Sequence, residues 1–154
     1  MKIEVTKVGF SAAHFLIGHE RCEHVHGHNW TVGVSVSGET DKKGMVIDFD
    51  LLKKILSEIC AKYDHKLLLP GRSSHVTLES DGKSLALKSG GRMYIFPEQD
   101  VLILPVENVT AEELARLILS EVSDKLGEFN NILEVEVWVE ESPGKRAIAS
   151  RSLR

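Results

Sequence analysis

Three segments of the chain alternate apolar and polar residues with a period of two, which predicts β-strands. Residues 2–10 are rich in β-prone residues, with Ile3 and Val5 on one face. The stretch WTVGVSVSG, residues 30–38, places large apolar side chains on one face and small residues on the other. The stretch LEVEVWVEE, residues 133–141, repeats the pattern with mostly glutamates on its second face. We expect each strand to be half-buried against a hydrophobic core.

Two further segments carry apolar residues at the spacing of an amphipathic helix. In LLKKILSEICAKYD, residues 51–64, these residues follow Asp48 and Asp50, either of which offers an N-cap. The second segment opens with Thr110 and Glu113, which form a capping-box pattern, and it ends before a glycine. The sequence therefore predicts two helices, one after the second strand and one before the last.

Residues 70–106, between the predicted helices, contain three short strand candidates, HVTLES, KSLALK and RMYIF. Asp-Gly and Ser-Gly-Gly sequences separate them, which predicts an inserted β-hairpin or small meander. The whole pattern is that of an α+β fold, in which helices cover one face of an antiparallel sheet. At 154 residues the chain fits a single domain, residues 1–154, with a substantial core.

Composition and charge narrow the classes of function. The net charge is −4 and the basic residues are scattered, which argues against a nucleic-acid partner. No apolar run reaches the roughly 20 residues needed to cross a bilayer, and the N-terminus lacks the apolar core of a signal peptide. We therefore expect a cytoplasmic protein with no membrane partner. Of the two cysteines, Cys60 lies on the apolar side of a predicted helix, so we expect Cys22 to be free rather than in a disulfide.

The stretch CEHVHGHNW, residues 22–30, concentrates metal-binding side chains at the start of the second strand. His26 and His28 are two residues apart, so both imidazoles point to the same face, and Gly27 leaves room between them. Antiparallel pairing with the first strand would bring His14 alongside. Three neutral imidazoles with one open position are the ligand set of a catalytic zinc, whereas structural zinc sites are closed by four protein ligands.

Other interpretations of this stretch stay open. The histidines could be surface or capping residues. His19 and His24 fit the ligand set less well, although His24 shares the strand parity of the two predicted ligands and is a fourth candidate. Cys22, four residues before His26, could face the same cavity as a ligand, a nucleophile or a proton acceptor.

Two acidic residues stand out for their positions. Asp64 precedes His65 at the end of the first predicted helix, and such a pair orients an imidazole for proton relay, although a helix C-terminus alone also favours a histidine. Glu141 shares strand parity with Val139, so it lies on the apolar face if the strand extends that far. There it needs a hydrogen-bonding partner, such as an amidine-like ligand edge. If the strand ends at Val139, Glu141 is an ordinary loop residue.

These motifs, with FSAAH, GMVIDF, YDHKLL, ENVTAEELA and VWVEESP, resemble the 6-pyruvoyl-tetrahydropterin synthase family, which includes the microbial 6-carboxy-tetrahydropterin synthases. The resemblance covers most of the chain except residues 70–106, which depart from compact family members. It implies a tunnelling fold, in which each subunit contributes a four-stranded antiparallel sheet and two helices. It also implies a homo-oligomer, commonly a hexamer made of two trimers, with active sites at subunit interfaces.

The resemblance further implies roles for individual residues. The implied zinc ligands are His14, His26 and His28. The implied catalytic residues are Cys22, Asp64 and His65, the last two usually contributed by a neighbouring subunit. The implied pterin-binding residues are Glu141 and Thr110.

The implied activity is that of a zinc-dependent carbon–oxygen lyase. It would eliminate triphosphate from 7,8-dihydroneopterin triphosphate and give 6-carboxy- or 6-pyruvoyl-tetrahydropterin. The short spacing from Cys22 to His26 resembles the microbial 6-carboxy enzymes, which favours the deazapurine pathway leading to queuosine or archaeosine. Cleavage of dihydroneopterin to a 6-hydroxymethyl pterin, for folate or methanopterin synthesis, is the alternative within the family.

Two hypotheses come from other classes of protein. A zinc-stabilised binding module would need the three histidines but neither Cys22 nor Glu141. A zinc hydrolase would use a metal-bound hydroxide on ester or amide substrates and would need no pterin.

Overall fold

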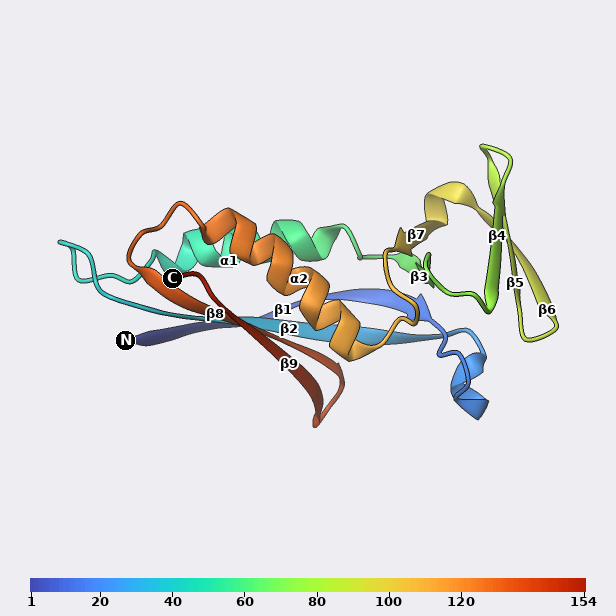
Figure 1. The fold of residues 1–154 in the computed structure, drawn as a ribbon, viewed down its shortest axis with the longest axis horizontal. Helices are drawn as coiled ribbons and strands as arrows, with labels where there is room; N and C mark the ends of the chain where they lie inside the picture. The colour runs from blue at the N-terminus through green and yellow to red at the C-terminus, as the bar shows by residue number, and fades with distance from the viewer.

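The computed structural model describes residues 1–154 and contains two sheets (Figure 1). The larger sheet has six strands in the order β7-β3-β1-β2-β8-β9, and the smaller has three in the order β4-β5-β6. The strands are β1 (Lys2–His14), β2 (His26–Gly38), β3 (Lys66–Pro70), β4 (Val76–Ser80), β5 (Ser84–Ser89), β6 (Arg92–Pro97), β7 (Val101–Leu104), β8 (Ile132–Ser142) and β9 (Lys145–Ser152). The helices are α1 (Phe49–Ala61), α2 (Ala111–Leu126) and the short 3-10 helices η1 (Glu20–Glu23) and η2 (Glu98–Asp100).

The main core lies between the long strands and the two α-helices. Strands β1, β2, β8 and β9 pair antiparallel, and α1 and α2 cover one face of them (Figure 1). The inward side chains of β2 are Trp30, Val32, Val34 and Val36, and none is more than 2% exposed. The predicted alternation in this strand is therefore confirmed, and so is the α+β class with helices on one face of the sheet.

Both helices begin at residues that the sequence predicts as caps. The Asp48 carboxylate accepts hydrogen bonds from the backbone N–H groups of Asp50 and Leu51, so Asp48 rather than Asp50 caps α1. The Thr110 hydroxyl oxygen accepts from the backbone N–H of Glu113 at 3.2 Å and caps α2. Neither helix has both the length and the apolar character that a membrane span requires.

The large sheet has six strands, whereas the resemblance implied four and the alternation predicted three of the six. β3 and β7 read KLLLP and VLIL; β3 pairs in parallel with β1, and β7 pairs in parallel with β3. Such strands are short apolar runs without alternation, so a period-two pattern does not reveal them. β9 reads KRAIASRS, in which the inward residues Ala147 and Ala149 are too small to give a clear hydrophobic signal.

The inserted segment forms an antiparallel meander, as predicted, made of β4, β5 and β6. It has a small hydrophobic cluster of its own, which it shares with β3 and with the loop that follows β1. The cluster contains Phe15, Leu67, Leu69, Leu85 and Leu87. The meander is therefore packed against the residues that directly follow His14.

Candidate metal centre and adjoining pockets

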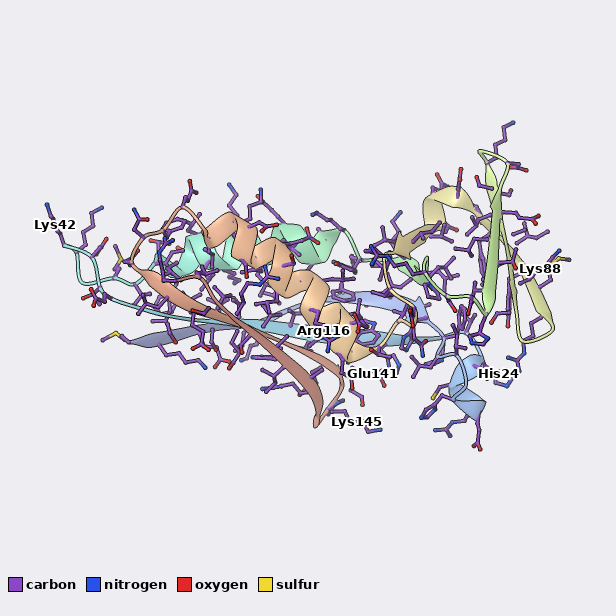
Figure 2. All side chains as sticks on the ribbon, in the orientation of Figure 1. His24, Lys42, Lys88, Arg116, Glu141 and Lys145 are labelled. Carbon is purple, nitrogen blue, oxygen red and sulfur yellow. The ribbon has the colours of Figure 1, made fainter.

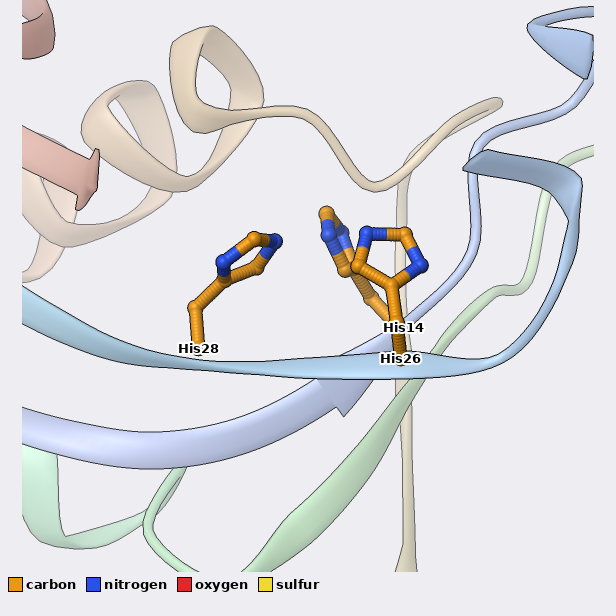
Figure 3. Close-up of side chains that lie close together, drawn as sticks. All are labelled: His14, His26 and His28. Carbon is orange, nitrogen blue, oxygen red and sulfur yellow. The ribbon is translucent and has the colours of Figure 1, made fainter. Parts of the chain in front are cut away.

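The pairing of β1 with β2 brings three histidines together. His14 lies opposite His26 in the antiparallel register, and Ala12 lies opposite His28. Because alternate residues of a strand share a face, all three imidazoles point to the helix-covered side, as Figure 3 shows. One ring nitrogen from each lies within 4.8 Å of the other two. The predicted ligand set of His14, His26 and His28 is thus assembled within one chain.

Two backbone carbonyls set the orientation of the rings. His14 Nδ1 lies 2.8 Å from the carbonyl oxygen of Val109, and His26 Nδ1 lies 2.7 Å from that of His24. A carbonyl only accepts, so each Nδ1 carries the proton and each Nε2 presents a lone pair. The Nε2 atoms of His14 and His28 are buried and have no hydrogen-bond partner in the protein. Buried, unpartnered nitrogens that converge on one point fit a bound metal cation.

Electrostatics favour the neutral rings that a metal requires. Burial lowers the pKa of His14 to about 4, because the cation is costly to desolvate. Burial also lowers the pKa of His28, although the Glu141 carboxylate opposes that shift. Neutral imidazoles at neutral pH are ready to bind a metal without first losing protons.

Glu141 lies at the edge of the histidine cluster. Strand β8 extends to Ser142, so Glu141 is not in a loop, although its pairing with β9 is irregular between Glu140 and Ser142. Its carboxylate oxygens lie 3.7 Å from His28 Nε2 and 4.0 Å from His14 Nε2. Glu141 also lines a pocket of about 570 Å³ together with Thr110, so the structure brings the two predicted pterin-binding residues into one cavity.

Cys22 is in η1, in the loop between β1 and β2, and is partly buried. Its backbone oxygen accepts a hydrogen bond from the N–H of Leu16 at 2.7 Å, which closes the loop. The cluster of converging ligand atoms consists of the three histidines alone and does not include the Cys22 sulfur. The geometry therefore favours a role for Cys22 other than that of a metal ligand.

Asp64 and His65 form a pair apart from the metal cluster. His65 Nδ1 lies 2.8 Å from one Asp64 carboxylate oxygen, and the other oxygen accepts from the backbone N–H of Ser11 at 2.9 Å. The Ser11 hydrogen bond, followed by the one from His65, lowers the pKa of Asp64. The His65 side chain is 83% exposed and lines an open hollow, to which His28 also contributes. Within one chain the pair therefore faces solvent rather than the three histidines.

Comparison with known proteins decides the family of the chain. The family model described as 6-pyruvoyl tetrahydropterin synthase matches residues 3–152. The chain belongs to this family.

Relatives within the 6-pyruvoyl tetrahydropterin synthase family agree along most of the sequence. A Methanocaldococcus jannaschii protein, provisionally named a 6-carboxy-5,6,7,8-tetrahydropterin synthase, is 42% identical over 142 residues, covering 90% of this chain and 86% of its own. The 6-carboxy-5,6,7,8-tetrahydropterin synthase of Rickettsia typhi is 32% identical over 123 residues, covering 78% of this chain and 79% of its own. The chain is accordingly an enzyme of the tetrahydropterin synthase type.

Solved structures from the family share the whole fold, including the inserted meander. A Plasmodium falciparum 6-pyruvoyl tetrahydropterin synthase superimposes with a TM-score of 0.92 at 30% identity, covering 99% of this chain and 98% of that one. A Plasmodium vivax 6-pyruvoyltetrahydropterin synthase, in a variant with a catalytic glutamate replaced by alanine, gives a TM-score of 0.93 at 26% identity with the same coverage. The resemblance expected from the motifs is confirmed, and it extends across residues 70–106.

Some groups around the histidine cluster and the Glu141 pocket could not be identified from the sequence. The carbonyl groups of Val109 and His24 orient two of the rings, but a backbone oxygen leaves no signature in a sequence. His24, the fourth candidate ligand, is exposed and contributes this carbonyl rather than its ring. Lys145 lines the pocket of Glu141 from β9, the strand that the sequence pattern missed.

Proposed function

We propose that the chain is a zinc-dependent lyase that eliminates triphosphate from 7,8-dihydroneopterin triphosphate and yields a 6-substituted tetrahydropterin. The observation that carries the proposal is the convergence of His14, His26 and His28 beside the carboxylate of Glu141. The printed names of the relatives, 6-carboxy-5,6,7,8-tetrahydropterin synthases, support the product class. A pterin carries the amidine-like edge that a partly buried carboxylate can bind.

Three neutral imidazoles with an open fourth position suit zinc in a catalytic site. Bound by His14, His26 and His28, zinc would polarise the side-chain hydroxyl oxygens of the substrate and acidify the neighbouring C–H bonds. The carbonyl groups of Val109 and His24 keep the ligand nitrogens turned inward. Burial keeps the His14 ring neutral, so it does not have to lose a proton before binding.

Glu141 would anchor the pterin. Its carboxylate can accept paired charge-assisted hydrogen bonds from the amino group and the ring N–H of the pterin, which would hold the side chain of the substrate over the histidines. Thr110 lines the same pocket. The Thr110 oxygen already accepts from Glu113 N–H, which leaves the hydroxyl proton available to donate to a ligand.

Cys22 would accept a proton from the side chain of the substrate, and His65 would pass protons as triphosphate leaves. Asp64 orients the His65 ring and stabilises its charged form. His65 also has a φ of 57°, a left-handed conformation that residues other than glycine rarely adopt and that often marks functional positions. Because this pair faces solvent within one chain, we propose that it completes the site of a neighbouring subunit in a homohexamer.

A second candidate function is supported by the Plasmodium vivax enzyme, in which a glutamate is a catalytic residue. In this chain Glu23 directly follows Cys22, so the loop before the histidines carries a carboxylate as well as a thiol. The competing reaction is cleavage of dihydroneopterin to a 6-hydroxymethyl pterin. Under the first proposal Cys22→Ala abolishes formation of the 6-substituted tetrahydropterin and Glu23→Gln does not. Under the second, Glu23→Gln abolishes formation of the 6-hydroxymethyl pterin and Cys22→Ala does not.

The names of the relatives favour the 6-carboxy product, and therefore a place in deazapurine biosynthesis leading to queuosine or archaeosine, in the cytoplasm. The test is to incubate the purified protein with dihydroneopterin triphosphate and to identify the products by mass spectrometry. Zinc-dependent release of triphosphate supports the proposal if it accompanies 6-pyruvoyl-tetrahydropterin, or 6-carboxy-tetrahydropterin together with the two side-chain carbons released as an aldehyde. A 6-hydroxymethyl pterin supports the second candidate, and an unchanged substrate contradicts both.

A further inference from the structure

A second cavity, of about 700 Å³, is distinct from the pocket of Glu141. It lies between the inserted meander and the loop that joins β1 to β2. Its polar walls come from the loop after β3, from the β5–β6 turn and from the segment before α2. The residues that matter here are Arg72, Ser73, His75, Ser89, Arg92 and Asn108. We propose that this cavity binds the phosphate groups of the substrate; the identity of the ligand rests on the function proposed above.

The chemistry of the walls is suited to phosphate oxygens. Arg72 and Arg92 supply two guanidinium groups, and the serines supply hydroxyl donors. Arginine binds phosphate through forked, charge-assisted hydrogen bonds. The side chain of Arg72 takes part in none of the hydrogen bonds or ion pairs within the protein, so its donors are free for a ligand.

Arg92 is held only loosely by its protein partners. Its guanidinium lies 3.9 Å from the Glu23 carboxylate and 3.5 Å from the Glu23 carbonyl oxygen. The carboxylate is also engaged by the backbone N–H of Gly18 at 3.0 Å. Glu23 and Glu107 both line the cavity and oppose an anion, so binding depends on the attraction of the two guanidinium groups, which weakens as salt is added.

The position of the cavity matches the far end of an extended substrate. Glu141 borders the cluster at His14 and His28, on the side of β8 and β9. The cavity lies on the opposite side of the cluster, beside the loop that joins β1 to β2. Figure 2 shows Glu141 near the β9 hairpin and His24 toward the meander. A substrate whose pterin is held at Glu141 and whose hydroxyls lie at the histidines would extend its phosphates toward Arg92.

The cavity and the metal cluster share a wall. Asn108 donates from its amide to the carbonyl oxygen of Ile17 at 3.4 Å and accepts from the Ile17 N–H at 3.1 Å. The next residue, Val109, holds the His14 ring through its carbonyl oxygen. The meander is fixed to the same loop by its contact with Phe15. These contacts hold the backbone segments that form the walls of the cavity, while the two guanidinium groups stay free to turn toward an anion.

Inorganic tripolyphosphate is the direct probe of this subsite, measured by isothermal titration calorimetry on the full chain at low salt. The variants are Arg72→Gln, Arg92→Gln and the double variant, with Arg151→Gln on exposed β9 as the matched control. We expect the double variant to bind at least about 10-fold more weakly, since two charge-assisted contacts are lost, and the control to match the unmodified protein. Thermal melts check that each variant is folded.

A rival location is the pocket of Glu141, where Lys145 offers a positive charge. If Lys145→Gln weakens tripolyphosphate binding and the arginine variants do not, the phosphates lie beside the pterin and the proposal is overturned. Absence of binding to the unmodified protein, or equal binding by the double variant, also overturns it.

Turnover separates this proposal from the proposed function. With dihydroneopterin triphosphate, the double variant should show a KM raised about 10-fold and a kcat that changes less, since the arginines hold the phosphates rather than the reacting carbon atoms. If tripolyphosphate binding depends on the arginines but no turnover occurs, the subsite stands and the proposed function fails. If turnover occurs and its KM is insensitive to both arginines, the function stands and the subsite fails.

Discussion

The Nδ1 atom of His14 lies 2.8 Å from the carbonyl oxygen of Val109, 95 residues further along the chain. This contact joins the end of β1 to the segment before α2, and it fixes the ring with Nε2 facing His26 and His28. Because His14 is fully buried, its ring can be neutral or bind a metal, but it is costly to protonate. The contact therefore links folding to the orientation of a ring that could bind a metal.

The first prediction concerns pH and the metal-free protein. The pKa of His14 is about 4 in the folded state and near its ordinary value of 6.5 in the unfolded chain. Between these values only the unfolded state takes up the proton, so stability is full above about pH 6.5 and falls as the pH drops toward 4. The loss from this residue is up to about 3 kcal/mol. Urea unfolding of chelator-treated protein at pH 7 and pH 5 measures it.

The control for this pH effect is His14→Gln, which removes the titrating ring. Its stability should fall less steeply over the same range of pH, whatever its stability at pH 7. If stability falls equally with pH in the two proteins, another group causes the loss. His14 would then take up its proton as readily in the folded state as in the unfolded chain.

The second prediction separates ring ligands from their neighbours. His26→Ala and His28→Ala should each reduce bound zinc well below about one ion per chain, because three protein ligands are the minimum for such a site. His24→Ala is the matched control, since it removes an exposed ring from the same loop and keeps the carbonyl that orients His26. Elemental analysis of dialysed protein gives the zinc content. Loss of zinc in the His24 variant alone would mean that the ring of His24 coordinates.

The third prediction concerns Glu141. Glu141→Ala should weaken binding of the pterin by about 1 to 3 kcal/mol and slow turnover, because the donor edge of the pterin is left without a partner. Zinc content should not change. Because the carboxylate lies within 4.0 Å of two ligand nitrogens, elemental analysis is needed beside the binding titration. A fall in zinc content would identify Glu141 as a fourth metal ligand rather than a pterin anchor.

The fourth prediction tests the division of labour between subunits. Cys22→Ala should retain zinc and pterin affinity while turnover falls by a factor on the order of 10² to 10⁴, the usual effect of losing a positioned acid–base group. His65→Ala should also be inactive. Mixing the two variants under conditions of subunit exchange should restore part of the activity, since some interfaces then combine an intact Cys22 with an intact His65. If exchange occurs and activity stays absent, the site does not span two chains as proposed.

Local patterns in the sequence were enough to predict the histidine cluster. His26 and His28 share a face because of the period of a strand, and His14 joins them because consecutive strands pair antiparallel. Glu141 was a harder case, since periodicity alone did not decide whether β8 reached it. Pairing with β9 extends the strand to Ser142, and that partner was hidden by small inward residues.

Features that depend on contacts distant in sequence could not be predicted in this way. The Val109 carbonyl is a backbone group, and only the packing of α2 against the sheet brings it to His14. Strands β3 and β7 acquire their partners through parallel pairing across long connections, which leaves no alternation in the sequence. The cavity between Arg72 and Arg92 likewise exists only because the meander folds back onto the loop after β1.

The most direct test of the account is a zinc titration of turnover. Protein stripped of metal by a chelator is supplied with increasing zinc, and triphosphate release from dihydroneopterin triphosphate is measured at each step. The account predicts no turnover without metal and a linear rise that saturates at about one zinc per chain, with no rise for His28→Ala. Full turnover by the stripped protein, or equal restoration of the His28 variant, would contradict it.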